Sequence, residues 1–474
     1  MTIRIVPDLA RASVTAAPAP DVWARIGGWL QRHQRTIRAV QWGVVSIYAV
    51  LLMVPVLLPL PDRTAYLWSN LTRFAQFVFW GLWWPFVLVG TALVGRIWCG
   101  LLCPEGSITE FASGRGLGKA TPRWMTWPGW PTVAFASTTL YGQMISVYQY
   151  PRPTLLILGG STAAAALVGY LYGRNKRVWC RYLCPASGIF ALLAKIAPLH
   201  FRVEPALWQR SQLAREKLGP VNCAPLVPLR TMRGGSECHM CGRCSGFRGA
   251  IRLARRSPNH EIVHVAGQAA RPWETVLIVF GLMGLALGAF QWSASPWFVA
   301  AKQWAATRLI EAGVLWPIEA TAPWWLLTNY PDRNDVLTLL DGALLVAYMA
   351  AVALASGAAT AVLLLLSARG LGRWNAARFH HLAQALIPLA GAGVFLGLSS
   401  LTVSQLRSDG IVVPFVGEMR AALLVVASLW SVVLCWQITA LYTIRRVRRV
   451  LALCAFCAAM APANAGWFLL FSAW

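Results

Sequence analysis

Long apolar runs constrain the fold of this chain more than any other feature. A helix that crosses a bilayer needs about 20 mainly apolar residues. Nine stretches approach or exceed that length, namely 40–60, 74–95, 130–150, 154–172, 273–293, 335–366, 381–402, 419–441 and 450–472. Charged residues make up 12% of the chain, about half their share in a soluble globular protein. The sequence therefore predicts an all-α polytopic membrane protein with about nine transmembrane helices.

The basic residues predict the orientation of these helices. The formal net charge of +25 would suit a nucleic-acid partner, but the arginines and lysines gather at the ends of apolar runs, as membrane topology requires. Arg369 to Arg378 and Arg445 to Arg449 fall on one side if the first helix starts in the cytoplasm. We therefore expect a cytoplasmic N-terminus, contact with membrane lipid, and no nucleic acid.

Composition divides the chain into four parts. Residues 1–38 are rich in Ala and Pro and then basic, which predicts a disordered tail and a surface helix. Residues 39–197 carry four spans. Residues 198–271 are less apolar and predict a small cytoplasmic domain, which at this size needs a metal to supplement its core. Residues 272–474 carry five spans, with an aromatic-rich outer loop at 294–334.

Two cysteine pairs occur in matched contexts inside a repeat. Cys99-x3-Cys103-Pro and Cys180-x3-Cys184-Pro each follow an apolar run, a basic residue and a tryptophan. Both end an outside-to-inside helix, so a duplicated arrangement would bring four thiolates together on one face. Thiolates bind zinc, Cu(I) or iron–sulfur clusters. We expect a second cluster or a copper site here, with a redox dithiol or simple packing as the alternatives.

A second set of four cysteines lies in the soluble segment. Cys238, Cys241 and Cys244 are spaced by two residues, as in bacterial ferredoxins. The position four residues after Cys244 is an arginine, so we assign Cys223 as the fourth ligand. Zinc is the alternative, although zinc sites usually pair two separate C-x2-C units. The spacing favours one [4Fe–4S] cluster, beside basic residues that suit an acidic redox partner, namely Arg243, Arg248 and Arg252.

The paired Trp-Cys-x3-Cys-Pro motifs after transmembrane helices, followed by a ferredoxin-like segment, resemble the NapH/NosR/CcoG group of membrane-bound polyferredoxins. Residues 74–256 carry the resemblance. It implies electron transfer across or along the bacterial inner membrane, to or from quinones or a periplasmic reductase. In some members it implies reduction of metal ions, copper especially. Typical members have two full ferredoxin motifs, whereas this chain has one incomplete set, and its second half has no matching counterpart.

Two histidines are further candidates for a metal or quinone site. His380 and His381 lie at the inner end of the span at 381–402, and ionisable groups at such boundaries are functional candidates. Interfacial anchoring is the alternative. The sequence as a whole predicts a membrane-bound iron–sulfur protein that relays electrons between redox partners, with no catalytic residue assigned. The alternative function is a copper or metal-ion reductase, or an assembly factor for a metalloenzyme.

Overall fold

The computed structural model describes residues 21–62, 64–214, 218–269 and 271–474. Among these residues, eight helices are long and apolar enough to cross a membrane. They are Gln34–Leu57 (α2), Leu71–Val94 (α3, a π-helical stretch and α4), Pro151–Tyr172 (α8 to α9), Pro272–Gln291 (α13 to α14), Leu339–Gly370 (α17), Ile387–Ser408 (α19), Val416–Tyr442 (α20) and Arg446–Ala473 (α21 and a final π-helical turn). Each overlaps an expected span, which confirms the all-α polytopic class. The first 20 residues of the expected tail lie outside the described residues.

Shorter elements connect and cover these helices. They are α1 (Val22–Arg32), α5 (Ile97–Leu101), α6 (Pro104–Gly114), α7 (Trp130–Met144), α10 (Val178–Tyr182), α11 (Ser187–Leu193), β1 (Leu199–Val203), α12 (Pro205–Leu213), β2 (Ile251–Arg255), α15 (Pro296–Glu311), α16 (Trp316–Glu319), β3 (Asn329–Tyr330), β4 (Asp335–Val336) and α18 (Ala376–Gln384). The expected outer loop at 294–334 therefore contains two helices and a strand of its own.

The remaining expected span, at 130–150, corresponds to the 15-residue helix α7. It is shorter than the other eight, yet it joins the same two ends of the bundle. Near its start, the Thr132 hydroxyl donates to the carbonyl of Trp273 at the beginning of α13, 3.2 Å away. At its end, the Thr328 amide donates to the Met144 carbonyl at 2.8 Å. Thus α7 runs the depth of the bundle between the two halves.

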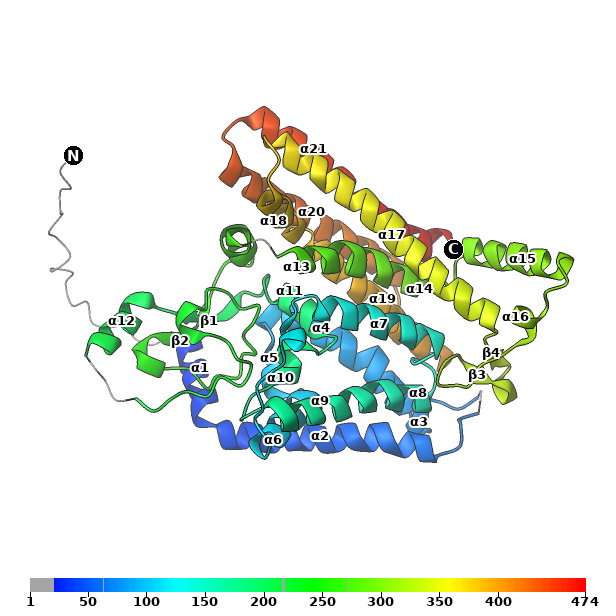
Figure 1. Ribbon diagram of the computed structural model, residues 1–474, viewed down its shortest axis with the longest axis horizontal. Helices are drawn as coiled ribbons and strands as arrows, with labels where there is room; N and C mark the ends of the chain where they lie inside the picture. Colours follow the sequence, from blue (N-terminus) through cyan, green and yellow to red (C-terminus); the bar gives the residue numbers. More distant parts are fainter. Residues whose placement is uncertain (1–20, 63, 215–217, 270) are drawn as a thin grey trace.

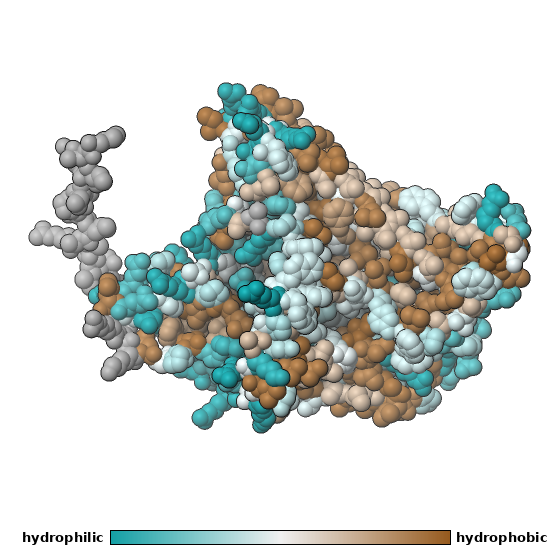
Figure 2. All heavy atoms as spheres, in the orientation of Figure 1, coloured by the Kyte–Doolittle hydropathy of each residue, from teal (hydrophilic) through white to brown (hydrophobic). Residues whose placement is uncertain are grey.

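The helices run roughly between two ends of the molecule (Figure 1). The soluble segment with β1, β2 and α12 lies at one end, together with α18 and the start of α21. The C-terminus, α15, α16 and the β3–β4 pair lie at the other end. Figure 2 shows apolar side chains over the middle of this face and hydrophilic ones gathered toward both ends. This is the pattern of an apolar band flanked by two water-facing surfaces.

The soluble segment is built on two antiparallel strands, which the sequence analysis did not predict. In β1 and β2, Phe201 lies opposite Leu253, and both side chains are buried. The surface helix expected near the N-terminus is α1, and it packs directly on this segment. A Cβ on Gly27 would lie 3.1 Å from the Cβ of Leu253, and Leu30 is 6% exposed. Helix α1 therefore completes the core of a segment that follows the whole repeat in the chain.

Candidate metal centre

The two cysteine pairs adopt the same local structure, as their matched sequences predict. In the first, a single helical turn, α5, ends where the Cys103 amide donates to the Trp98 carbonyl at 2.9 Å. In the second, α10 ends where the Cys184 amide donates to the Trp179 carbonyl at 3.0 Å. Each turn follows a helix that ends at a glycine; the first is Gly95, whose φ of 75° lies in the left-handed region. The repeat therefore presents both pairs in one conformation.

All four cysteines of the repeat line a single cavity of about 190 Å³. Cys99 and Cys180 are 8% and 7% exposed, and Cys103 and Cys184 are half-buried. Each of the four is a free thiol. The repeats are joined across the cavity by Trp179, whose indole N–H donates to the Glu105 carboxylate at 3.1 Å. The duplication thus builds one four-thiol site from two half-sites.

Burial makes these thiols difficult to ionise on their own. It raises the pKa of Cys180 to about 12, although the Arg177 guanidinium opposes this shift. Burial also raises the pKa of Cys103, and the nearby thiols of Cys99 and Cys180 add to the effect. The pKa of Cys184 is raised for the same first reason. Because metal ligation requires thiolates, a cationic group in the cavity would offset this penalty.

The second set of cysteines lies in the soluble segment. Cys238 and Cys244 are buried in one apolar cluster together with Met240. Burial raises the pKa of Cys244, and the charges of Cys238, Cys241 and Cys223 add to the effect. Burial raises the pKa of Cys238 to about 12. The loop turns tightly because Met240 and Gly242 both have positive φ, 55° and 76°. Ligation of one cluster by these four cysteines stays a prediction.

Both sets fit a [4Fe–4S] cluster by the chemistry of their donors. Each supplies four thiols, and each has a backbone amide directed at a sulfur. Gly106 donates to the Cys103 sulfur at 3.5 Å, and Met240 donates to the Cys238 sulfur at 3.4 Å. Hydrogen bonds of this kind tune iron–sulfur clusters. No group of three or more His, Cys, Asp or Glu side chains that could hold a single metal ion is found in the described ranges.

The two sites touch each other through backbone atoms. A Cβ on Gly100, inside the first cysteine pair, would lie 2.0 Å from the carbonyl oxygen of His239 and 2.9 Å from the amide nitrogen of Cys241. Two glutamines of α2 form hydrogen bonds to the two segments that meet here. Gln41 donates to the Gly100 carbonyl at 2.9 Å, and Gln34 donates to the Cys241 carbonyl at 3.0 Å. The membrane site and the soluble site are therefore neighbours with no intervening layer.

Two buried arginines near both sites were not assigned from the sequence. Arg96 and Arg177 precede the first cysteine of each pair by three residues and are 5% and 1% exposed. Their signal was present in the sequence, because the repeat places Arg-x-Trp-Cys in both contexts. Their contacts are tertiary, however, and follow only from the fold.

The remaining sequence candidates occupy other surroundings. Both ring nitrogens of His381 are in hydrogen bonds, Nε2 with the Ile262 carbonyl and Nδ1 with the Tyr442 hydroxyl, each at 2.8 Å. His380 Nδ1 lies 2.9 Å from the Thr275 hydroxyl. These contacts join α18 to its neighbours, and a metal or quinone role for the pair stays a prediction. In the soluble segment Arg252 is exposed on β2.

Comparison with known proteins finds a match on the repeat. Residues 76–121 and 155–204 match the 4Fe–4S binding domain family. The first segment contains Cys99 and Cys103, and the second contains Cys180 and Cys184. No curated protein and no solved structure matches the chain. The two matched segments support iron–sulfur binding, and the eight membrane-length helices among the described residues indicate a multi-pass membrane protein.

Proposed function

We propose that the protein relays single electrons through the bacterial inner membrane, between a cytoplasmic or quinone donor and a membrane or periplasmic acceptor. The resemblance to the NapH/NosR/CcoG polyferredoxins supports this role, as does the family match on the repeat. A [4Fe–4S] cluster bound at each site would supply the one-electron chemistry. The cysteines hold the cofactors, and the surrounding helices fix their positions and exclude water.

The direct contact between the two sites is the observation that carries the proposal. Gly100 leaves no room for a side chain between the first cysteine pair and the loop from Cys238 to Cys241. One site lies in the membrane repeat and the other in the soluble segment. A protein that only stored or inserted metal would not require two such sites in contact, whereas a relay does.

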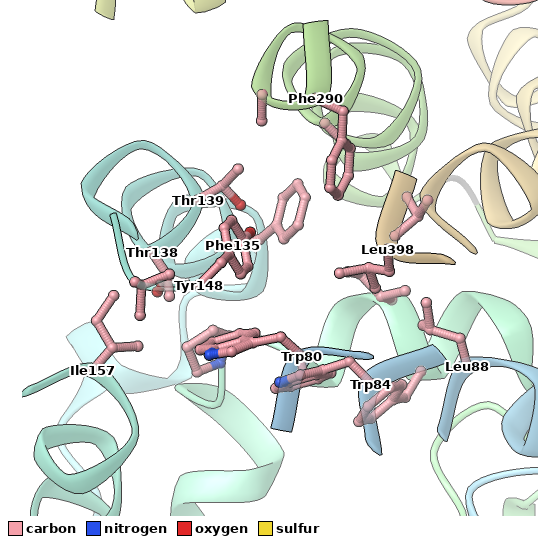
Figure 3. A pocket seen from close by; sticks show the side chains of 18 residues that line it. Trp80, Trp84, Leu88, Phe135, Thr138, Thr139, Tyr148, Ile157, Phe290 and Leu398 are labelled. Atoms are coloured by element: carbon pink, nitrogen blue, oxygen red, sulfur yellow. The ribbon is translucent and has the colours of Figure 1, made fainter. Parts of the chain in front are cut away.

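A second cavity supports a partner inside the membrane. It has a volume of about 130 Å³ and lies between the first-half helices and α14 and α19 of the second half. Figure 3 shows Trp80, Trp84, Phe135, Tyr148 and Phe290 facing it. An engineered core cavity of about 150 Å³ accommodates a benzene ring, so the size suits the ring of a quinone. Trp80, Trp84 and Phe190 also line the cysteine cavity, so the two cavities adjoin.

The sidedness of the proposal follows from charge. The soluble segment and the loops that carry Arg369 to Arg378 and Arg445 to Arg449 lie at the same end of the bundle. Under the positive-inside rule this end faces the cytoplasm. Soluble redox partners would then meet the protein at the Cys223–Cys244 site, and membrane partners would meet it near the repeat.

Metal analysis after anaerobic purification tests the proposal. We expect about eight iron and about eight acid-labile sulfide per chain, as two cubane clusters require. Replacing Cys99 and Cys180 with Ala should remove about half of each. Replacing Cys238 and Cys241 with Ala should remove the other half. Cys454→Ala, on the exposed surface of α21, is the matched control and should remove none.

Other metal contents would decide against the relay. Copper at the paired cysteines, with iron for one cluster only, would favour the metal-ion reductase or assembly factor. Zinc without sulfide would exclude both functions. Normal iron in the wild type together with unchanged iron in the Cys99 and Cys180 variants would show that the repeat does not hold a cluster.

A further inference from the structure

The repeat places one buried arginine beside each cysteine pair. Arg96 and Arg177 occupy equivalent positions, and each has less than a tenth of its surface exposed. A buried guanidinium is unfavourable unless charges and hydrogen bonds compensate it. The contacts of the two arginines therefore indicate which negative charge the fold places there.

Arg177 bridges the two repeats and faces both cysteine sites. Its Nη1 donates to the carbonyl of Cys99 in the other repeat, and its Nε donates to Glu110 at 2.8 Å. The Arg177 amide donates to the carbonyl of Ala224 at 2.8 Å, and Ala224 follows Cys223 of the soluble site. Arg177 therefore contacts both sites.

Arg96 repeats the arrangement from the other side. Its Nη1 donates to the Ser236 carbonyl at 3.1 Å, on the loop that leads into Cys238. It also lines the cavity that holds the four cysteines of the repeat. Among the described residues, Arg96 Nε and Arg177 Nη2 have no hydrogen-bond partner although both atoms are buried. Each arginine therefore retains a donor in the region where the two sites meet.

The nearby carboxylates do not neutralise this positive charge. Glu110 is shared between Arg177 and Arg243, at 2.8 and 2.7 Å. Burial opposes the ionisation of Glu110, but the two arginines outweigh it and hold its pKa below the usual range, so one negative charge meets two cations. Glu105 lines the cysteine cavity together with Arg96, and burial raises the pKa of Glu105, which favours its uncharged form. The junction between the two sites is thus electropositive before any cofactor binds.

We propose that Arg96 and Arg177 are positioning residues that set the reduction potentials of both cysteine sites together. The inference rests on the proposed function, in which each site holds a cluster. Reduction adds negative charge to a site, and a buried cation in a medium of low dielectric constant favours that state. Because each arginine contacts both the repeat and the soluble segment, its loss lowers both potentials, whereas an arginine near one site alone would change one.

A redox titration followed by electron paramagnetic resonance tests this inference on the whole purified protein. We expect Arg96→Gln and Arg177→Gln each to weaken reduction of both sites by about tenfold, a shift of about 59 mV to lower potential for one electron. Arg177→Lys retains the charge and should restore most of the shift. Arg202→Gln removes an arginine that is 54% exposed on β1 and should leave both potentials unchanged.

Glu110→Gln gives a test of opposite sign. It removes the shared carboxylate, so both potentials should rise, and this variant keeps the inference testable if an arginine variant fails to fold. Shifts no larger than that of Arg202→Gln, or shifts confined to one site, would overturn the inference while leaving the relay intact. A wild-type protein without iron and sulfide would instead overturn the proposed function itself.

Discussion

At the scale of single residues, Gly100 determines how closely the two sites approach. Its missing side chain lets the first cysteine pair press on the backbone of His239 and Cys241. The position within the motif, between two cysteines, gives no indication of this role in the sequence. A position can require glycine for several reasons, such as a positive φ or a close approach of another backbone. Only the fold shows that Gly100 is required for a close backbone contact.

Gly100→Ala should therefore separate the two sites. The added methyl group would lie 2.0 Å from a backbone oxygen, and overpacking of this kind costs about 1–3 kcal/mol. We expect a lower melting temperature and a loss of magnetic coupling between the two reduced sites in electron paramagnetic resonance. Gly90→Ala, in α4 with nothing within 4 Å of the new Cβ, is the control. Unchanged coupling in Gly100→Ala would show that the loops adjust freely.

The cysteines could be predicted at this scale and the arginines could not. Spacing along the chain groups Cys238, Cys241 and Cys244, and repetition groups the two pairs, because both are local patterns. The structure places the four cysteines of the repeat around one cavity, whereas the ligand set of the soluble segment stays a prediction. The partners of Arg177 lie in the other repeat and in the soluble segment, and no local pattern encodes such contacts.

At the scale of elements, the soluble segment depends on an anchored loop. The carboxylate of Glu261 accepts hydrogen bonds from the amides of Gly235 at 2.7 Å and Ser236 at 3.4 Å, just before Cys238. It also forms a buried ion pair with Arg256, whose side chain is 5% exposed. Helix-length apolar runs do not indicate β1 and β2, although Ile251 and Leu253 flank Arg252 in the apolar–polar alternation of a strand.

Glu261→Gln should loosen this loop and the cluster that it supports. Removing one partner of a buried ion pair costs about 3–5 kcal/mol. We expect the Cys223–Cys244 site to lose its iron to an added chelator at least several times faster than in the wild type, while the repeat keeps its own. Glu204→Gln, which removes the half-exposed partner of Arg202, should change neither rate. Equal iron loss from both sites in Glu261→Gln would contradict the local role of the loop.

At the scale of the whole molecule, the two halves enclose a cavity that neither contains alone. Its walls come from the first-half helices and from α14 and α19. The places of eight of the nine expected membrane helices could be predicted, because length and hydropathy are properties of single segments. The cavity could not, because it depends on how helices with apolar surfaces on all sides pack against one another.

Filling the cavity tests whether it takes a membrane redox partner. Ala289 lines the cavity and is 4% exposed, so Ala289→Phe should occupy the ring-sized space. We expect reduction by a soluble quinol analogue to slow at least tenfold, with iron and sulfide unchanged. Ala351→Phe, at an exposed position on α17, is the control for adding a ring in the membrane. Equal quinol reduction by both variants would place the partner elsewhere.

The packing of α1 on β2 has a consequence for biogenesis. Residues Val22–Arg32 are synthesised before the repeat, but their partner strand, Ile251–Arg255, follows only after all helices of the repeat have been made. Contacts of such long sequence separation form late and slowly. Helix α1 therefore stays without its partner strand while the whole repeat is inserted. The core of the soluble segment can form only once β2 has been made and packs on α1. The membrane centre can therefore mature first.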